Sequence, residues 1–564
     1  MKLFSSILAI LFLVGSYTKA QDDTKRITGT EFNHAAIVTA HPLASQVGVD
    51  ILKKGGNAID AAIAVQFALA VVYPNAGNIG GGGFMVYRDK DGFVTSLDFR
   101  EKAPASAHRD MYLDEKGNPI TDLSLYGQLA AGVPGSVAGM DEAHKKFGSM
   151  PWKELINPAI DFAEKGFPIT ARQAKEFNNY LKRFKKFNPN GAAIIRNKDW
   201  KPGNLFVQKQ LAGTLKRIAN QGRDGFYKGA TADFIVAEMK RGNGIITHAD
   251  LADYHAVWRE PIVGTYKDYK IISMPPPSSG GIALLALLQS VEQYPLQDWG
   301  FQSDSTVRAM VEAERYVYAD RASYLGDPDF YNVPVKHLTN KKFNRDRMAK
   351  VNLAKATPST EVNASSFPGY EPEETTHFSI VDAEGNAVSL TTTINGSYGS
   401  YVWVDGAGFL LNNEMDDFSV KPGTPNLYGL LGGKANAIAP QKRMLSAMTP
   451  TIIEQGGHLK MVIGTPGGST IITSVFQGIL NVLEFGMSAQ ESVSKPRFHH
   501  QWKPDRIDVE EKAIADPIRK SLEGDGYILH PRNTIGRMKN IVVLPNGKLQ
   551  TGADPRGDDF AEGY

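Results

Sequence analysis

The chain contains no cysteine among its 564 residues. This absence excludes disulfide bonds, thiolate metal sites and a cysteine nucleophile. The chain also lacks an excess of charge, because 62 basic residues nearly balance 60 acidic ones and leave a formal net charge of +2. So balanced a total charge gives no indication of the basic surface that binds nucleic acid. Hydrophobic residues make up 42% and charged residues 22% of the chain, which is typical of a globular protein with a large core.

Several common functional signatures are missing as well. The chain has no Gly-x-Ser-x-Gly elbow and no His-Glu-x-x-His zinc helix. The glycine run at 80–83 lacks the Lys-Ser/Thr of a phosphate-binding loop and precedes a predicted strand, so it indicates close backbone packing. His499 and His500 are adjacent and would face opposite sides of a strand, so we interpret them as surface or structural residues. We therefore expect no metal site and no cofactor.

Residues 1–20 have the pattern of a signal peptide. Lys2 supplies the positive start, residues 7–14 form a short apolar core, and Ala20 is a small residue at the expected cut. The alternative is a membrane anchor, but this apolar run is much shorter than the about 20 residues needed to cross a bilayer. No later run is long and apolar enough to span a membrane. We expect a periplasmic or secreted protein without a membrane anchor once the signal peptide is removed.

Helical and strand patterns alternate along the rest of the chain. Residues 43–73 predict two helices separated by the break at 55–57, and the second is apolar nearly all round, which predicts burial. Further helices are expected at 282–294, 305–325 and 471–485, and strands at 84–87, 451–453, 461–463 and 541–543. No internal repeat is visible.

A change of composition precedes Thr375. Residues 357–374 (TPSTEVNASSFPGYEPEE) have no apolar period, which predicts an exposed, flexible arm. Residues 375–381 then show the alternating residue pattern of a strand. Residues 382–386 predict a tight turn, and residues 387–394 predict a second strand that returns beside the first. A threonine at a chain N-terminus can act as a nucleophile, because its α-amine has a reference pKa of about 7.7–8.0 and can accept the hydroxyl proton. From these residues alone, a cut before Thr375 and a plain domain linker both stay open.

Several long motifs, in the same order, resemble the γ-glutamyltransferase (γ-glutamyltranspeptidase) family over residues 31–564. They are GGNAIDAAIAVQFALAVVYP (55–74), GGGGFMVY (80–87), LDFREKAP (97–104), TTHFSIVDAEGNAVSLTTTIN (375–395), LLNNEMDDFS (410–419), GTPGGS (464–469) and DPRGDDFAEGY (554–564). The resemblance implies an α+β fold, the four-layer αββα sandwich of N-terminal-nucleophile hydrolases. It also implies that this sandwich is formed jointly by two subunits cut from one precursor.

The resemblance further implies an autocatalytic cut between Glu374 and Thr375. A large subunit of residues 21–374 and a small subunit of residues 375–564 would then pair as a heterodimer within one folded unit. The implied activity is that of a γ-glutamyltransferase and glutathione hydrolase. The γ-glutamyl group of glutathione or a related amide would form an ester with Thr375 and pass to water, an amino acid or a dipeptide.

Site residues are carried over from the family motif by motif. The resemblance implies that Thr393 hydrogen-bonds the nucleophile Thr375 and that the N–H groups of Gly467 and Gly468 form an oxyanion hole. The implied substrate contacts are Arg100 and Ser446 to the α-carboxylate, Asn395, Glu414 and Asp417 to the α-ammonium, and Tyr428 as part of a lid. One departure is Ala447, where the family usually has a second serine; the hydroxyl is lost there, while a backbone N–H could still serve.

Two alternatives accompany this interpretation. One is an acylase of the same superfamily, of the cephalosporin or polyglutamate-processing type, against which Arg100 and Tyr428 argue because both suit a small amino-acid-like acyl group. The other is a secreted, non-catalytic homologue, which loss of Thr375 or of the two glycines would favour; all three are present.

Overall fold

The structure is a computed structural model that describes residues 28–362, 375–421, 426, 430 and 432–564. The predicted signal peptide, the cleavage-site residue Glu374 and the predicted lid residue Tyr428 lie outside the described residues.

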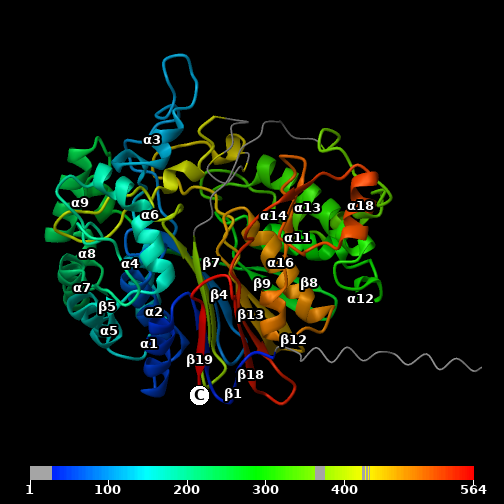
Figure 1. The fold of residues 1–564 in the computed structure, drawn as a ribbon, viewed down its shortest axis with the longest axis horizontal. Coiled ribbons are helices and arrows are strands. Elements are labelled where there is room, and N and C mark those ends of the chain that lie inside the picture. The colour runs from blue at the N-terminus through cyan, green and yellow to red at the C-terminus, as the bar shows by residue number, and fades with distance from the viewer. Residues whose placement is uncertain (1–27, 363–374, 422–425, 427–429, 431) are drawn as a thin grey trace, which may run out of the picture.

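Two seven-stranded antiparallel sheets lie face to face in the middle of the molecule (Figure 1). The first sheet has the order β1 (Glu31–Phe32), β18 (Leu549–Ala553), β17 (Lys539–Val543), β13 (His458–Gly464), β12 (Thr451–Gln455), β9 (Tyr269–Ser273) and β8 (Ile262–Tyr266). The second has the order β19 (Phe560–Gly563), β2 (Ala36–Thr39), β10 (Thr376–Val381), β11 (Ala387–Thr393), β3 (Gly82–Arg88), β4 (Val94–Asp98) and β7 (Val257–Arg259). Two small sheets, β5 (Phe167–Pro168) with β6 (Leu205–Phe206) and β14 (Phe498–His499), β15 (Ile507–Val509) and β16 (Leu529–Pro531), lie apart from them.

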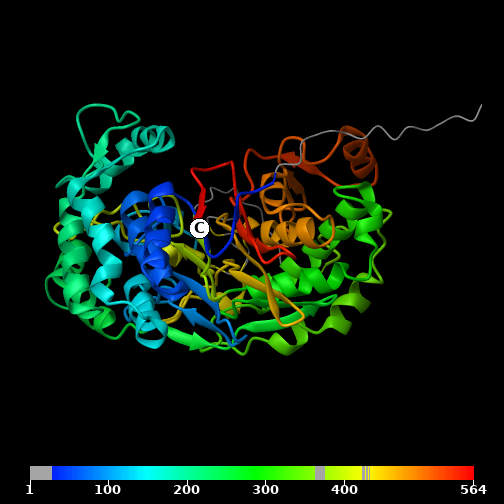
Figure 2. The same ribbon diagram turned by 90° about the horizontal axis from the view of Figure 1, so that it is seen from below.

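Helices cover the outer face of each large sheet (Figures 1 and 2). The layer beside the second sheet holds α1 (Pro42–Lys53), α2 (Ala58–Val72), α4 (Ser136–Phe147), α5 (Trp152–Lys165), α6 (Ala171–Phe187), α7 (Lys209–Gln221), α8 (Asp224–Tyr227) and α9 (Gly229–Arg241). The layer beside the first sheet holds α11 (Gly280–Val291), α12 (Leu296–Trp299), α13 (Asp304–Tyr324), α14 (Val335–Leu338), α15 (Lys341–Met348), α16 (Thr470–Leu483), α17 (Ala489–Ser494) and α18 (Asp516–Gly524). The short helices α3 (Thr121–Leu125) and α10 (His248–Ala252) complete the set. The expected αββα sandwich is confirmed.

The local predictions agree with these elements. Asn57 caps α2 in a reciprocal box with Asp60, so the chain ends one helix and starts another at the predicted break. Every residue of α2 is buried, as its uniformly apolar sequence predicted. Among the described residues, none of the helices has the length and apolar character that a membrane span requires.

The hairpin that follows position 375 forms the centre of the second sheet. β10 pairs with β11 on one side and with β2 on the other, and β11 pairs with β3. Strands from before and after the predicted cut therefore pair with each other within this sheet. The first sheet also joins strands from before and after the predicted cut, since β9 pairs with β12 and β1 pairs with β18. The segments on either side of residue 374 share both cores.

One expectation from the sequence is corrected in part, and one open alternative is decided. In the described part of the predicted arm, residues 357–362, Pro358, Thr360 and Glu361 are exposed as expected, but Ser359 is anchored. Ser359 donates its backbone N–H to Asp505 at 2.7 Å and its hydroxyl to the carbonyl of Trp502 at 2.6 Å, and Val362 is buried. His499 and His500 are structural but not on the surface, because both are buried with hydrogen-bond partners of their own.

Candidate active site

Thr375 lies directly before β10 and faces Thr393 on β11. The strand register pairs Thr376 with Thr392, which places the two threonines opposite each other. Their hydroxyl oxygens are 3.5 Å apart, and both residues are buried. The backbone N–H of Asn395 donates to the Thr393 hydroxyl at 2.8 Å. This bond orients the Thr393 hydroxyl, so that its hydrogen is available to Thr375.

His377 is on the same face of β10 as Thr375, since side chains two positions apart share a face. Its two ring nitrogens contact the hydroxyls of Thr391 at 2.9 Å and Ser379 at 3.1 Å. Burial, followed by the charge of Lys539, holds the pKa of His377 well below its ordinary value, so the ring is neutral. Both of its nitrogens are thus engaged away from the Thr375 hydroxyl.

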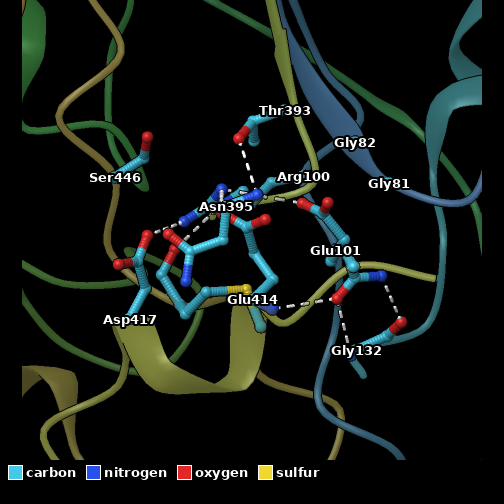
Figure 3. A network of polar contacts seen from close by, with 12 residues as sticks. Gly81, Gly82, Arg100, Glu101, Gly132, Thr393, Asn395, Glu414, Asp417 and Ser446 are labelled. Carbon is cyan, nitrogen blue, oxygen red and sulfur yellow. Dashed lines mark hydrogen bonds and ion pairs between the residues drawn. The ribbon is translucent and has the colours of Figure 1, made fainter. Parts of the chain in front are cut away.

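Arg100 lies at the centre of a buried ionic cluster with three carboxylates (Figure 3). One terminal nitrogen of its guanidinium donates to Glu414 and lies 3.6 Å from Glu101. The other donates to Asp417 at 2.5 Å. Arg100 follows β4, and its backbone N–H donates to Asp98 at 2.9 Å, while Glu414 and Asp417 are the ends of a single 3₁₀ turn.

The cluster has three carboxyl groups for one guanidinium. Burial raises the pKa of Glu101 to about 7 and raises those of Glu414 and Asp417, although Arg100 opposes each shift. Burial alone would lower the pKa of Arg100, but the three carboxylates raise it above its ordinary value. Neither oxygen of Glu101 has a hydrogen-bond donor among the described residues. A cation that entered this cluster would be stabilised.

The residues predicted to bind the two charges of an amino-acid head group are therefore paired with each other. The carboxylate-binding fork of Arg100 is occupied by Glu414 and Asp417, the two acidic residues predicted to bind the ammonium. A zwitterion can enter such a pair by exchange, its carboxylate taking the guanidinium and its ammonium taking the acids.

Gly467 and Gly468 follow β13 and precede α16. Their φ angles of 140° and 52° lie in the region that favours glycine. The amide of neither residue donates to an acceptor among the described residues. Of the two, Gly468 lines the pocket that contains Thr375.

Most of the predicted site residues line one small pocket. It is lined by Arg100, Thr375, Thr393, Asn395, Glu414, Asp417, Ser446 and Gly468. Gly467 does not line it, and Ala447 and Arg321 do. Sequence reasoning missed Glu101 and Arg321: Glu101 was visible as the neighbour of Arg100 in LDFREKAP, whereas Arg321 lies in a helix without a recognisable motif. No cluster of three or more metal-binding side chains is found within the described ranges.

An αββα sandwich with a hydroxyl residue directly before a central strand defines an N-terminal-nucleophile hydrolase. The family model for gamma-glutamyltranspeptidase matches residues 44–564. The chain belongs to this family.

Named relatives agree with the assignment. The chain is 46% identical over 531 residues to the glutathione hydrolase proenzyme of Escherichia coli (strain K12), covering 94% of this chain and 91% of that one. It is 49% identical over 523 residues to the glutathione hydrolase proenzyme of Pseudomonas sp. (strain A14), covering 92% of this chain and 90% of that one. The crystal structure of cephalosporin acylase from Bacillus halodurans superposes with a TM-score of 0.83 at 26% identity, covering 98% of this chain and 99% of that one.

Proposed function

We propose that the protein is a γ-glutamyltransferase and glutathione hydrolase that uses Thr375 as its nucleophile. The observation that carries the proposal is the single pocket in which the paired hydroxyls of Thr375 and Thr393 meet the cluster of Arg100, Glu414 and Asp417. A γ-glutamyl group carries one carboxylate and one ammonium on the same carbon, and this pocket offers a guanidinium and two carboxylates. The high identity to two glutathione hydrolase proenzymes supports the same substrate class.

Maturation would cut the chain between Glu374 and Thr375. The Thr375 hydroxyl attacks the Glu374 carbonyl carbon, and its proton passes to the Thr375 nitrogen as the peptide C–N bond breaks, which frees the α-amine. Water then hydrolyses the ester, leaving a carboxylate on Glu374 and the free hydroxyl on Thr375. The products are residues 21–374 and 375–564, once residues 1–20 have been removed on export. Because both segments contribute paired strands to both large sheets, the cut would leave one folded heterodimer.

Turnover would reuse the same hydroxyl. The α-amine of Thr375 accepts the hydroxyl proton, the oxygen attacks the γ-carbonyl carbon, and the backbone N–H groups of Gly467 and Gly468 donate to the developing oxyanion. The amide C–N bond then breaks, and the leaving amine takes the proton. Water or the amine of an amino acid or dipeptide attacks the glutamyl ester and releases Thr375.

Substrate binding would open the ion pairs of Arg100. The α-carboxylate takes the guanidinium and Ser446, and the α-ammonium takes Glu414, Asp417 and Asn395. Tyr428 belongs to this proposal only through the family resemblance, since it lies outside the described residues.

A cephalosporin-type acylase is the second candidate, favoured by the superposition on the Bacillus halodurans enzyme. A glutaryl acyl chain has no α-ammonium, so it would leave Glu414 and Asp417 without a cationic partner from the substrate. The deciding experiment compares γ-glutamyl-p-nitroanilide with glutaryl-7-aminocephalosporanic acid on the processed protein. We expect efficient turnover of the first and little of the second; the reverse preference would identify an acylase.

Ala447→Ser is expected to lower KM for γ-glutamyl substrates. The serine would add one hydroxyl donor near the α-carboxylate, and hydrogen bonds to charged groups contribute roughly 1.5–3 kcal/mol. Because a bridging water can replace part of such a bond, we expect a gain of about 1 kcal/mol, or several-fold in KM, with kcat nearly unchanged. Initial-rate kinetics on the processed variant check this; an unchanged or raised KM would mean that the carboxylate is already satisfied.

A further inference from the structure

Arg321 enters the active-site pocket from α13 and is held there by the hydroxyl of Ser279. Its side chain is buried, and its Nε donates to the hydroxyl of Ser279 at 2.9 Å. The Ser279 hydroxyl in turn donates to the carbonyl of Ser446 at 2.6 Å. The guanidinium is thereby fixed beside the loop that carries Ser446 and Ala447.

The charge of Arg321 has no counter-ion among the described residues. Other arginines of similar burial are paired: Arg88 with Glu454 at 2.6 Å, Arg443 with Asp98 at 3.3 Å and Arg497 with Asp554 at 2.8 Å. Arg321 forms no such pair, and its two terminal nitrogens donate to no described residue. Burial lowers its pKa to about 10, with Tyr318 and Asp417 opposing the shift. A buried charge without a partner is costly, and such groups usually serve a ligand.

Two further donors on the same loop also lack an acceptor. The backbone N–H of Ala447 donates to no described residue. The Ser446 hydroxyl accepts the N–H of Met448 at 3.1 Å, which leaves its own hydrogen free to donate. Arg321, Ser446 and Ala447 all line the pocket that contains Thr375.

Arg100 borders the same loop. Its guanidinium donates to the carbonyls of Met444 and Leu445, both at 3.3 Å. Two guanidinium groups thus lie along residues 444–447, of which Arg100 is saturated by carboxylates and Arg321 is not.

We propose that Arg321 is a second carboxylate-binding residue, which binds the α-carboxylate of the γ-glutamyl group together with the Ser446 hydroxyl and the Ala447 N–H. This inference rests on the proposed function and deepens it. It explains how a site with alanine at position 447 still binds the carboxylate: the charge of Arg321 supplies part of what a hydroxyl would. It also lets Arg100 keep part of its bonding to Glu414 and Asp417 while the substrate is bound.

The test compares two amides that differ only in the α-carboxylate. γ-Glutamyl-p-nitroanilide has this group, and 4-aminobutyryl-p-nitroanilide lacks it. In Arg321→Met we expect kcat/KM for the first to fall by about ten- to one-hundred-fold, the range of a lost charge-assisted hydrogen bond, mainly through KM. The much lower kcat/KM of the second should stay at its wild-type value. Arg321→Lys, which keeps the charge without the fork, should recover part of the loss.

Arg308→Met is the matched control, since Arg308 is on the same helix but is paired with Asp304 and Asp525. It should leave both kcat/KM values unchanged. An equal loss on both amides in Arg321→Met and Arg321→Lys would overturn the proposal in favour of a structural role, as would no loss on either. A loss confined to glutathione would assign Arg321 to the carboxylate of the leaving peptide instead. If the wild-type protein does not turn over γ-glutamyl-p-nitroanilide, the proposed function itself fails, independently of Arg321.

Discussion

Thr375→Ala is expected to yield one uncut chain without measurable γ-glutamyltransferase activity. Alanine lacks the hydroxyl that attacks Glu374 during maturation, and without the cut no α-amine forms at position 375. Loss of a nucleophile that acts together with its base reduces kcat by on the order of 10⁴–10⁶. Denaturing gel electrophoresis and the p-nitroanilide assay, run on the same preparation, measure both effects.

Thr375→Ser provides the control for this experiment. Serine keeps the hydroxyl and the future α-amine, so the serine variant should still be cut and retain activity. Thr375 is buried opposite Thr393, and serine differs from threonine at this position only by one methyl group. An uncut alanine variant that turns over γ-glutamyl amides would show that another residue is the nucleophile.

Arg100→Lys should lower kcat/KM for γ-glutamyl substrates by on the order of 100-fold, in line with the 2–5 kcal/mol cost of disrupting a buried charge pair. Lysine keeps the positive charge, but it cannot donate to Glu414 and Asp417, or to a carboxylate, through two parallel N–H groups. Three buried carboxylates would then share a single ammonium. Steady-state kinetics on the processed variant measure the effect, and we expect the cut before Thr375 to proceed.

Arg88→Lys is the matched control for Arg100. Arg88 is buried and paired with Glu454 at 2.6 Å, but neither residue lines the active-site pocket. The Arg88 variant should lower stability without changing KM. Wild-type kinetics in Arg100→Lys would show that this residue does not bind substrate.

Much of the fold could be predicted because its signals are local. The glycine break, the capping residue Asn57 and the uniformly apolar sequence of α2 all lie within one short stretch, and the structure follows them. The hairpin β10–β11 could likewise be predicted, because strand-like alternating residue patterns lie on either side of a short turn. The anchoring of Ser359 was not predictable, because its partners Asp505 and Trp502 follow more than a hundred residues later.

The same difference between local signals and long-range contacts applies to the candidate active site. The residues with motifs, such as Arg100, Glu414 and Asp417, could be identified, and the structure brings them into one pocket with Thr375. Their mutual pairing could not be predicted, since it joins segments more than 300 residues apart. Arg321 could not be identified at all, because its significance comes from the lack of a counter-ion in the described part of the chain, which only the packed structure reveals.

A γ-glutamyl ester should form during turnover on a threonine that maturation has made N-terminal. To detect it, the processed protein is mixed with a γ-glutamyl amide and quenched in acid within one turnover, and the peptides of the smaller chain are mapped by mass spectrometry. We expect this chain to begin at Thr375 and its first peptide to carry one γ-glutamyl group on that residue. A smaller chain that begins elsewhere, or a glutamyl group on any other residue, would contradict this expectation.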